Sequence, residues 1–303
     1  MGEVVTPEPV NSPTGVSKFL KGILFTAPLF MMAAAWGGAF QAIDHVKPES
    51  MATVPVSVEP EPDGPKLFLR HCANCHGEKG DGKGLTYLDP KARYFGYEPF
   101  KFVSTKNGIP TDDDLLRTIR RGVTGSPMHP FEGILTEPQM RAIVAHLREL
   151  TRRGRYAYER QLIDNDKSGE LEYEPLAVAA KVIRDTEPGE TLAVPKSFPP
   201  VSPESLTTGK ALFAGLCASC HGPNGDGNFP GAKDLKLWDK KTPARPFNFV
   251  AGVYRGGNEP EQIYKRIRVG IPYAAMPGND EKNLTDENAG HLVNYVRSLS
   301  GPK

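Results

Sequence analysis

Apolar residues follow helical spacing in two stretches of the chain, Ile143 to Leu150 and Leu292 to Leu299. Within each stretch they recur at intervals that place them on one face of a helix. A threonine followed by an acidic residue precedes each stretch, at Thr136-Glu137 and at Thr285-Asp286, and such a pair is typical of a helix start. The pattern therefore predicts two amphipathic helices, one in the middle of the chain and one at its end.

The two predicted helices close two copies of an internal repeat. Within each copy the same residues return in the same order around a pair of cysteines. The paired segments are Gly64-x-x-Leu67-Phe68 with Gly209-x-x-Leu212-Phe213, Gly77 to Gly82 with Gly222 to Gly227, Pro99-Phe100-x-Phe102 with Pro246-Phe247-x-Phe249, and Ile119-Arg120-x-Gly122 with Ile267-Arg268-x-Gly270. A repeat of this size predicts two domains of one kind.

Residues Gly22 to Ile43 form an uncharged, mostly apolar run that is long enough to cross a bilayer as a helix. Lys18 and Lys21 precede it, so the positive-inside rule predicts a cytoplasmic N-terminus, with the rest of the chain outside. A cleaved signal peptide is the alternative, because Ala33 to Ala35 resemble a cleavage site. Since the apolar run continues past these alanines, an uncleaved transmembrane anchor is favoured.

Two proline-rich segments divide the chain. Pro48 to Asp63 is predicted to be an extended tether, and Glu187 to Pro203 is predicted to be a second linker. The sequence thus predicts five regions, namely a cytoplasmic N-terminus with its anchor (1–47), a linker (48–63), a first domain (64–151), an interdomain linker (152–203) and a second domain (204–303).

Charge and composition narrow the function classes. The 303 residues include 37 Lys and Arg against 36 Asp and Glu, so the chain lacks the basic excess with which nucleic-acid-binding proteins neutralise phosphates. Its 31 Gly and 29 Pro predict loop-rich domains. A loop-rich domain of this size has a thin side-chain core, so we expect a bound group to fill part of it.

The 4 cysteines of the chain form two Cys-x-x-Cys pairs, and a histidine follows each pair directly. Without the histidine, such a pair is also found in dithiol redox sites and zinc sites. With it, the motif is the attachment site of haem c, in which the thiols bind the vinyl groups and the histidine binds the iron. Two motifs with no cysteine left over predict two covalently bound haems c. The predicted residues are Cys72, Cys75 and His76, and Cys217, Cys220 and His221.

An electron carrier keeps its iron six-coordinate, so each haem needs a second axial ligand. Met128 and Met276 follow Gly122 and Gly270 at the same spacing, in proline-bearing loops where a methionine is not expected as core filler. We therefore predict Met128 and Met276 as distal iron ligands. In the first domain His129 is an alternative ligand.

Several other polar residues are candidates for the haem surroundings. His146 lies on the first closing helix, where it is expected to pack between helices. His71 is expected to be a surface residue or a neighbour of a haem propionate, and not a ligand. Basic residues near the predicted ligand loops and aromatic segments can pair with haem propionates, the alternative being a solvated surface position. They are Arg93, Arg117, Arg120, Arg245, Lys265 and Arg268.

A segment that starts at Asp164 resembles the first half of an EF-hand calcium loop. The predicted ligands of a weak Ca²⁺ site are Asp164, Asp166 and Ser168. The pattern then fails, because Pro175 stands where the loop needs its bidentate glutamate and Glu174 comes one place early. A solvated turn between two helices is therefore the favoured interpretation.

The segments Gly64 to Leu150 and Gly209 to Leu299 each resemble the class I cytochrome c family. The resemblance rests on the Leu-Phe pair, the Cys-x-x-Cys-His-Gly motif and the later methionine of each copy, and it covers more than half of the chain. It implies two all-α class I cytochrome c domains, so that the predicted fold is all-α, with the N-terminal transmembrane helix followed by these two domains. In each domain the first and last helices would cross beside the haem.

Membrane-tethered dihaem members of this family resemble electron-transfer subunits of respiratory complexes. The resemblance therefore implies a carrier of single electrons, not an enzyme, on the periplasmic side of the cell inner membrane. The expected partners are other respiratory-complex subunits and, through the N-terminal helix, membrane lipid, with no nucleic acid. A dihaem cytochrome c peroxidase is the alternative, and it is disfavoured because it needs one iron without a methionine ligand.

Overall fold

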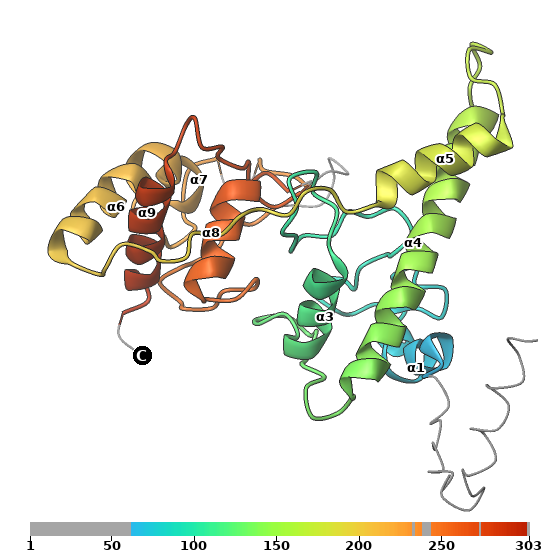
Figure 1. Cartoon of the computed structure of the whole chain (residues 1–303), viewed down its shortest axis with the longest axis horizontal. Helices are drawn as coiled ribbons and strands as arrows, with labels where there is room; N and C mark the ends of the chain where they lie inside the picture. Colours follow the sequence, from blue (N-terminus) through green and yellow to red (C-terminus); the bar gives the residue numbers. More distant parts are fainter. Residues whose placement is uncertain (1–61, 232–233, 238–243, 273, 302–303) are drawn as a thin grey trace, which may run out of the picture. The chain divides into compact units, whose positions relative to one another are not determined.

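The computed structural model describes residues 62–303 apart from 232–233, 238–243, 273 and 302–303. The described residues form nine helices and only isolated β-bridges, with no strand. The helices are α1 (Gly64–His71), α2 (Ala73–His76), α3 (Asp112–Arg121), α4 (Glu137–Asp164), α5 (Pro175–Thr186), α6 (Pro203–Leu216), α7 (Ala218–His221), α8 (Pro260–Val269) and α9 (Asp286–Ser298) (Figure 1). The predicted helical fold class is confirmed for this part of the chain.

The predicted transmembrane anchor at Gly22 to Ile43 lies outside the described residues. Among those that are described, no helix combines the length and the apolar character that are needed to span a bilayer. The anchor therefore stays a prediction.

Each domain is built on its closing helix. In the first domain α1 and α3 both pack against α4, and in the second α6 and α8 both pack against α9. The threonines predicted to start the closing helices are their N-caps. The Thr136 hydroxyl accepts a hydrogen bond from the backbone N–H of Gln139 at 3.4 Å, and the Thr285 hydroxyl accepts one from Asn288 at 3.3 Å. The two predicted helix starts are therefore confirmed.

A glycine allows the first and last helices of each domain to approach closely. At Gly64 in α1, an added β-carbon would lie 2.2 Å from the carbonyl oxygen of Ala142 in α4. At Gly209 in α6, it would lie 2.2 Å from the carbonyl oxygen of His291 in α9. A side chain at either position would force the helices apart. The helix crossing implied by the resemblance is thus present in both domains, and it depends on glycine.

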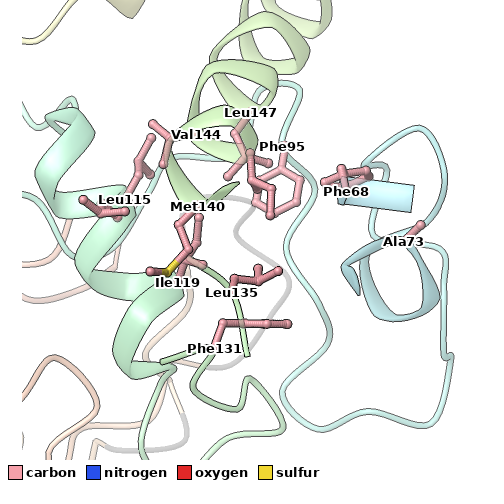
Figure 2. Packing of buried hydrophobic residues seen from close by; sticks show 12 residues of the cluster. Phe68, Ala73, Phe95, Leu115, Ile119, Phe131, Leu135, Met140, Val144 and Leu147 are labelled. Carbon is pink, nitrogen blue, oxygen red and sulfur yellow. The ribbon is translucent and has the colours of Figure 1, made fainter. Parts of the chain in front are cut away.

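The core of each domain is centred on a pair of aromatic rings. Phe68 in α1 and Phe213 in α6 are buried, and each lies edge-on to a second phenylalanine, Phe95 and Phe249 respectively. Figure 2 shows Phe68 and Phe95 with aliphatic side chains from α3 and α4 in the first domain. Met128 is half-buried and packs against this cluster. The predicted ligand loop therefore borders the core.

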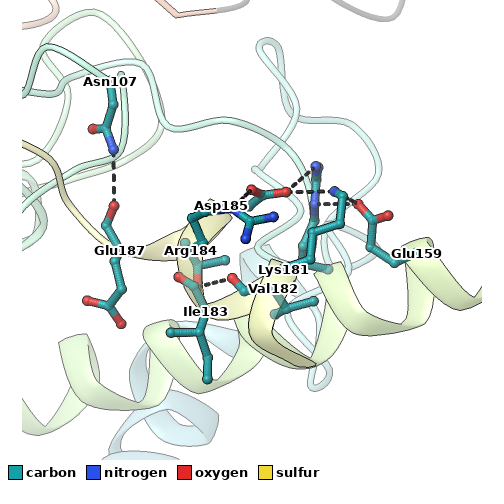
Figure 3. A network of polar contacts seen from close by, with 10 residues as sticks. Asn107, Glu159, Lys181, Val182, Ile183, Arg184, Asp185 and Glu187 are labelled. Atoms are coloured by element: carbon teal, nitrogen blue, oxygen red, sulfur yellow. Dashed lines mark hydrogen bonds and ion pairs between the residues drawn. The ribbon is translucent and has the colours of Figure 1, made fainter. Parts of the chain in front are cut away.

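The region between the two domains contains a helical hairpin. Helix α4 continues past the predicted domain end at 151, and α5 packs against its extension. Residues 152–163 contain no proline and are rich in good helix formers, so nothing stops the helix at the predicted boundary. Figure 3 shows the polar contacts of the hairpin, where the Lys181 ammonium lies 2.7 Å from both Glu159 and Asp185. The segment predicted as a linker is therefore partly helical.

Candidate functional site

Each Cys-x-x-Cys-His motif folds into a single turn of helix, α2 in the first domain and α7 in the second. The backbone N–H of His76 donates to the carbonyl oxygen of Cys72 at 2.9 Å, and that of His221 donates to Cys217 at 2.8 Å. One turn of helix brings side chains three residues apart onto the same face. The two thiols of each motif can therefore reach one bound group.

The first thiol of each motif has an apolar environment. Burial raises the pKa of the Cys72 thiol and of the Cys217 thiol to about 11. Both thiols are therefore protonated at neutral pH, unlike the thiolates of dithiol redox sites, whose pKa values are low. This environment suits attachment of an apolar group better than dithiol chemistry.

The two motif histidines are held in the same way. Nδ1 of His76 lies 3.0 Å from the backbone oxygen of Arg93, and Nδ1 of His221 lies 3.3 Å from that of Phe247. A protonated Nδ1 donates to this oxygen, which leaves Nε2 available for a metal. Burial lowers the pKa of both imidazoles, so both are neutral near pH 7. Each ring is thus ready to bind iron through Nε2.

A phenylalanine stacks on each of these histidines. The ring centroid of Phe95 lies 4.6 Å from that of His76, and Phe249 lies 4.6 Å from His221. The backbone N–H groups of both phenylalanines donate to equivalent glycines of the repeat. These shared contacts make Phe95 the structural counterpart of Phe249.

The pairing of Pro99 to Phe102 with Pro246 to Phe249, predicted from sequence spacing, is therefore wrong. Phe100 instead matches Tyr254, because each ring is nearly parallel to the stacking phenylalanine, with centroids 6.2 Å and 5.9 Å from it. The loop before the stacking phenylalanine is longer in the second domain, and the loop after it is longer in the first. The two length differences nearly cancel along the sequence, which hides the true correspondence.

The two predicted methionine ligands occupy matching loops. After α3, the backbone N–H of Val123 donates to the carbonyl oxygen of Met128 at 2.8 Å. After α8, that of Ile271 donates to the carbonyl oxygen of Met276 at 3.1 Å. Both methionines are half-buried. The structure thus places them at one position of the repeat, while their binding to iron stays a prediction.

The competing histidines of the first domain have other surroundings. His129 is exposed, and its ring centroid lies 4.5 Å from that of Phe131. His146 lies edge-on to Phe68 at 5.1 Å, so it packs between α4 and α1 as the sequence predicts. Because Met128 is half-buried and His129 is exposed, the methionine is the better placed of the two.

Three of the six basic residues considered as propionate partners form close ion pairs within the protein. Arg120 and Arg268 each form an ion pair with the first residue of the closing helix of their own domain. Arg117 pairs with an acidic residue of the second domain at 3.0 Å. Arg245 is exposed, and Lys265 is half-buried. Arg93 differs from these residues in the environment of its side chain, which points toward the Phe100 ring of its own domain.

Arg93 is half-buried, and its ion pair is a long one. Its side chain is 19% exposed, and its ion pair with Glu98 spans 3.9 Å. Burial lowers the pKa of Arg93 and of the neighbouring Lys101. Cations that are partly removed from water favour a nearby anion, and the propionates of a haem would supply one. The cations, the apolar thiol and the neutral imidazole therefore fit a haem c.

The segment predicted as a calcium loop is a turn between α4 and α5. The hydroxyl of Ser168 and the backbone N–H groups of Ser168 and Leu171 donate to Asp166, which lowers the pKa of that carboxyl to about 2. Asp164 pairs with Arg160 at 2.9 Å. Within the described residues, no group of three or more His, Cys, Asp or Glu side chains is gathered as metal ligands. Calcium binding stays a prediction.

The fold and the site define a tandem of two helical domains, each arranged to attach one haem c. A family model of cytochrome c matches residues 62–151 and 206–300, which together make up more than half of the chain. The chain therefore belongs to the cytochrome c family. Membership implies covalently bound haem c, and the two Cys-x-x-Cys sites fit two haems.

A solved structure provides a second comparison. The chain is similar to a chain of the reducing HAO-like protein complex of Kuenenia stuttgartiensis, with 32% sequence identity and a TM-score of 0.63. The match covers 78% of this chain and 95% of that chain. Its share of this chain is larger than the share covered by the two segments that match the family model. A comparison with curated proteins gave no match.

Proposed function

We propose that this protein is a dihaem electron carrier that transfers single electrons and has no substrate reaction of its own. The observation that carries the proposal is the repetition of one arrangement, in which a motif histidine with an available Nε2 is accompanied by a half-buried methionine loop. A bound haem c supplies a one-electron iron couple. Histidine and methionine ligands would keep each iron closed to substrates in both redox states.

The carrier proposal is tested with carbon monoxide and peroxide. The reduced full-length protein is expected to bind no stoichiometric carbon monoxide and to show no turnover of hydrogen peroxide with a small electron donor. The Met276→Ala variant is the positive control, because loss of the ligand opens one iron. Carbon monoxide binding at one haem of the unmutated protein, together with peroxide turnover, would show that the protein is a peroxidase and not a carrier.

We also propose that the protein works with other subunits of a larger oxidoreductase. The support is its similarity to a chain of a protein complex, which the match covers almost completely. Purification of the full chain from detergent-solubilised native membranes is expected to recover a redox-active partner in fixed stoichiometry. Recovery of this chain alone at every detergent and salt condition would contradict the proposal.

The proposed location is the outer face of the cytoplasmic membrane, within a respiratory chain. The support is the uncharged run Gly22 to Ile43 preceded by Lys18 and Lys21. The native chain is expected to stay in the membrane through a carbonate wash. A version that begins at Pro48 behind a cleavable export signal is expected to be soluble and to carry two haems. Release of the native chain by carbonate would argue against the anchor.

A further inference from the structure

A cation distinguishes the first haem site from the second. Arg93 lies two residues before the stacking Phe95, and the equivalent residue before Phe249 is Phe247. The backbone oxygens of Arg93 and Phe247 both accept hydrogen bonds from the motif histidines, which supports the equivalence. At this position the first domain therefore has a guanidinium side chain, and the second has a neutral ring with the guanidinium carbon of Arg255 5.9 Å from its centroid.

The guanidinium of Arg93 is turned into the domain. Its carbon lies 5.6 Å from the ring centroid of Phe100, and it donates to the carbonyl oxygen of Pro99. An arginine keeps its charge even when it is buried. The partner carboxylate of Glu98 is 34% exposed and 3.9 Å away, so water screens this pair and the positive charge is only partly offset.

Other charges that are matched between the two sites do not produce this difference. Arg120 and Arg268 each pair with the first residue of a closing helix. Lys101 and Arg255 directly follow the two equivalent aromatic rings, so each domain contributes one cation there. Among these positions, Arg93 is the charge that the second domain does not repeat.

We propose that Arg93 raises the reduction potential of the haem in the first domain above that of the second, so that electrons pass from the second domain to the first. A positive charge in a poorly solvated site favours the reduced state of the iron, either directly or by neutralising a propionate. Because the predicted axial ligands are the same in both domains, they do not set the order, and the charge of Arg93 is a difference that can. This inference rests on the proposed dihaem carrier.

The test is a spectroscopic redox titration of the full-length dihaem protein and of its Arg93→Gln variant. The variant is expected to lower the higher midpoint by about 59 mV or more, which is a tenfold change in a one-electron equilibrium constant. Arg141→Gln, at an exposed arginine of the same domain, is the matched control and is expected to shift neither midpoint. The Met276→His substitution lowers the reduction potential of the second haem. In this background the midpoint that stays high is assigned to the haem of the first domain.

A second variant keeps the test independent of how well Arg93→Gln folds. Glu98→Gln removes the partial counter-charge and is expected to raise the midpoint of the first haem, while Arg93→Lys keeps the charge and is expected to restore most of the native value. Unchanged midpoints in Arg93→Gln and Glu98→Gln, or a higher midpoint assigned to the second domain, would overturn the proposal. Such a result would leave the carrier function intact, since failure of that function appears as missing haem or carbon monoxide binding.

Discussion

The two predicted methionine ligands have different neighbours. Met128 is followed by His129, whereas Met276 is followed by Pro277. An imidazole is a strong iron ligand, and a proline side chain has no ligand atom. The first iron therefore has a substitute ligand within reach of its loop, and the second does not. Loss of the methionine should have different consequences in the two domains.

Met276→Ala is expected to open the second iron, so that the reduced protein binds carbon monoxide at one haem per chain. The Met128→Ala variant is expected to bind little carbon monoxide at the first haem, because His129 replaces the methionine and keeps this haem low-spin at a lower potential. Adding His129→Ala to Met128→Ala is expected to restore carbon monoxide binding. Carbon monoxide difference spectra check all three variants. Equal carbon monoxide binding by the two single variants would show that His129 does not replace Met128 as an iron ligand.

The residues of the site differ in how well the sequence predicts them. The Cys-x-x-Cys-His motif was predictable because covalent attachment imposes a fixed local spacing. The stacking Phe95 was missed because loops of unequal length hide its match to Phe249. The special position of Arg93 depends on burial, which is a property of the fold and not of the local sequence.

At the scale of the helices, the contact between the first and last helix of a domain positions the Cys-x-x-Cys-His motif, which follows the first helix directly. Gly209→Ala is expected to destabilise the second domain by about 1–3 kcal/mol, because the new methyl group would overlap the carbonyl oxygen of His291. Denaturant unfolding followed by haem absorbance measures this change.

Gly215→Ala is the matched control in the same helix. A β-carbon at Gly215 meets nothing within 4 Å, so this variant is expected to be neutral or to gain up to about 1 kcal/mol from higher helix propensity. If both alanine variants unfolded at the same denaturant concentration, close packing at Gly209 would not govern the helix crossing.

The helix starts were predictable, and one helix end was not. Thr136 and Thr285 cap α4 and α9 because a short polar side chain before an amphipathic run is a local signal. Helix α4 continues past the predicted boundary because residues 152–163 favour helix, and its extension packs against α5, the next helix of the chain. Apolar spacing therefore identified the part of α4 inside the domain and missed its extension to Asp164.

At the scale of the whole haem-binding region, two arginines on equivalent helices join the domains. Arg117 in α3 donates to the backbone oxygen of Gly256 at 2.9 Å, and Arg266 in α8 donates to that of Lys101 at 2.9 Å. Burial lowers the pKa of Arg266 to about 10, so it remains charged at neutral pH. The contact is reciprocal, because each arginine reaches the loop after the aromatic ring of the other domain.

Replacing both Arg117 and Arg266 by alanine is expected to uncouple the two domains. A single calorimetric transition should separate into two, and electron equilibration between the haems should slow, while the haem content stays at two. Arg141→Ala, which removes an exposed ion pair within the first domain, is the control and should change neither. An unchanged single transition in the double variant would show that these arginines do not couple the domains.

The repeat predicted two domains of one kind, and the family match agrees with this organisation. It did not predict the contact between them, because residues such as Arg117 and Gly256 become neighbours only in the folded chain. A sequence repeat indicates the fold of each domain, but it does not indicate which residues of the two domains contact each other.

The proposed carrier requires a methionine ligand on both irons, and the near-infrared spectrum of the oxidised full-length protein reports this ligation. Ligation by Met128 and Met276 predicts the weak near-infrared band of methionine-bound ferric haem with an intensity that corresponds to two haems per chain. Haem content from the pyridine haemochrome assay provides the scale. Half of this intensity, or no band with two haems present, would contradict methionine ligation of both irons.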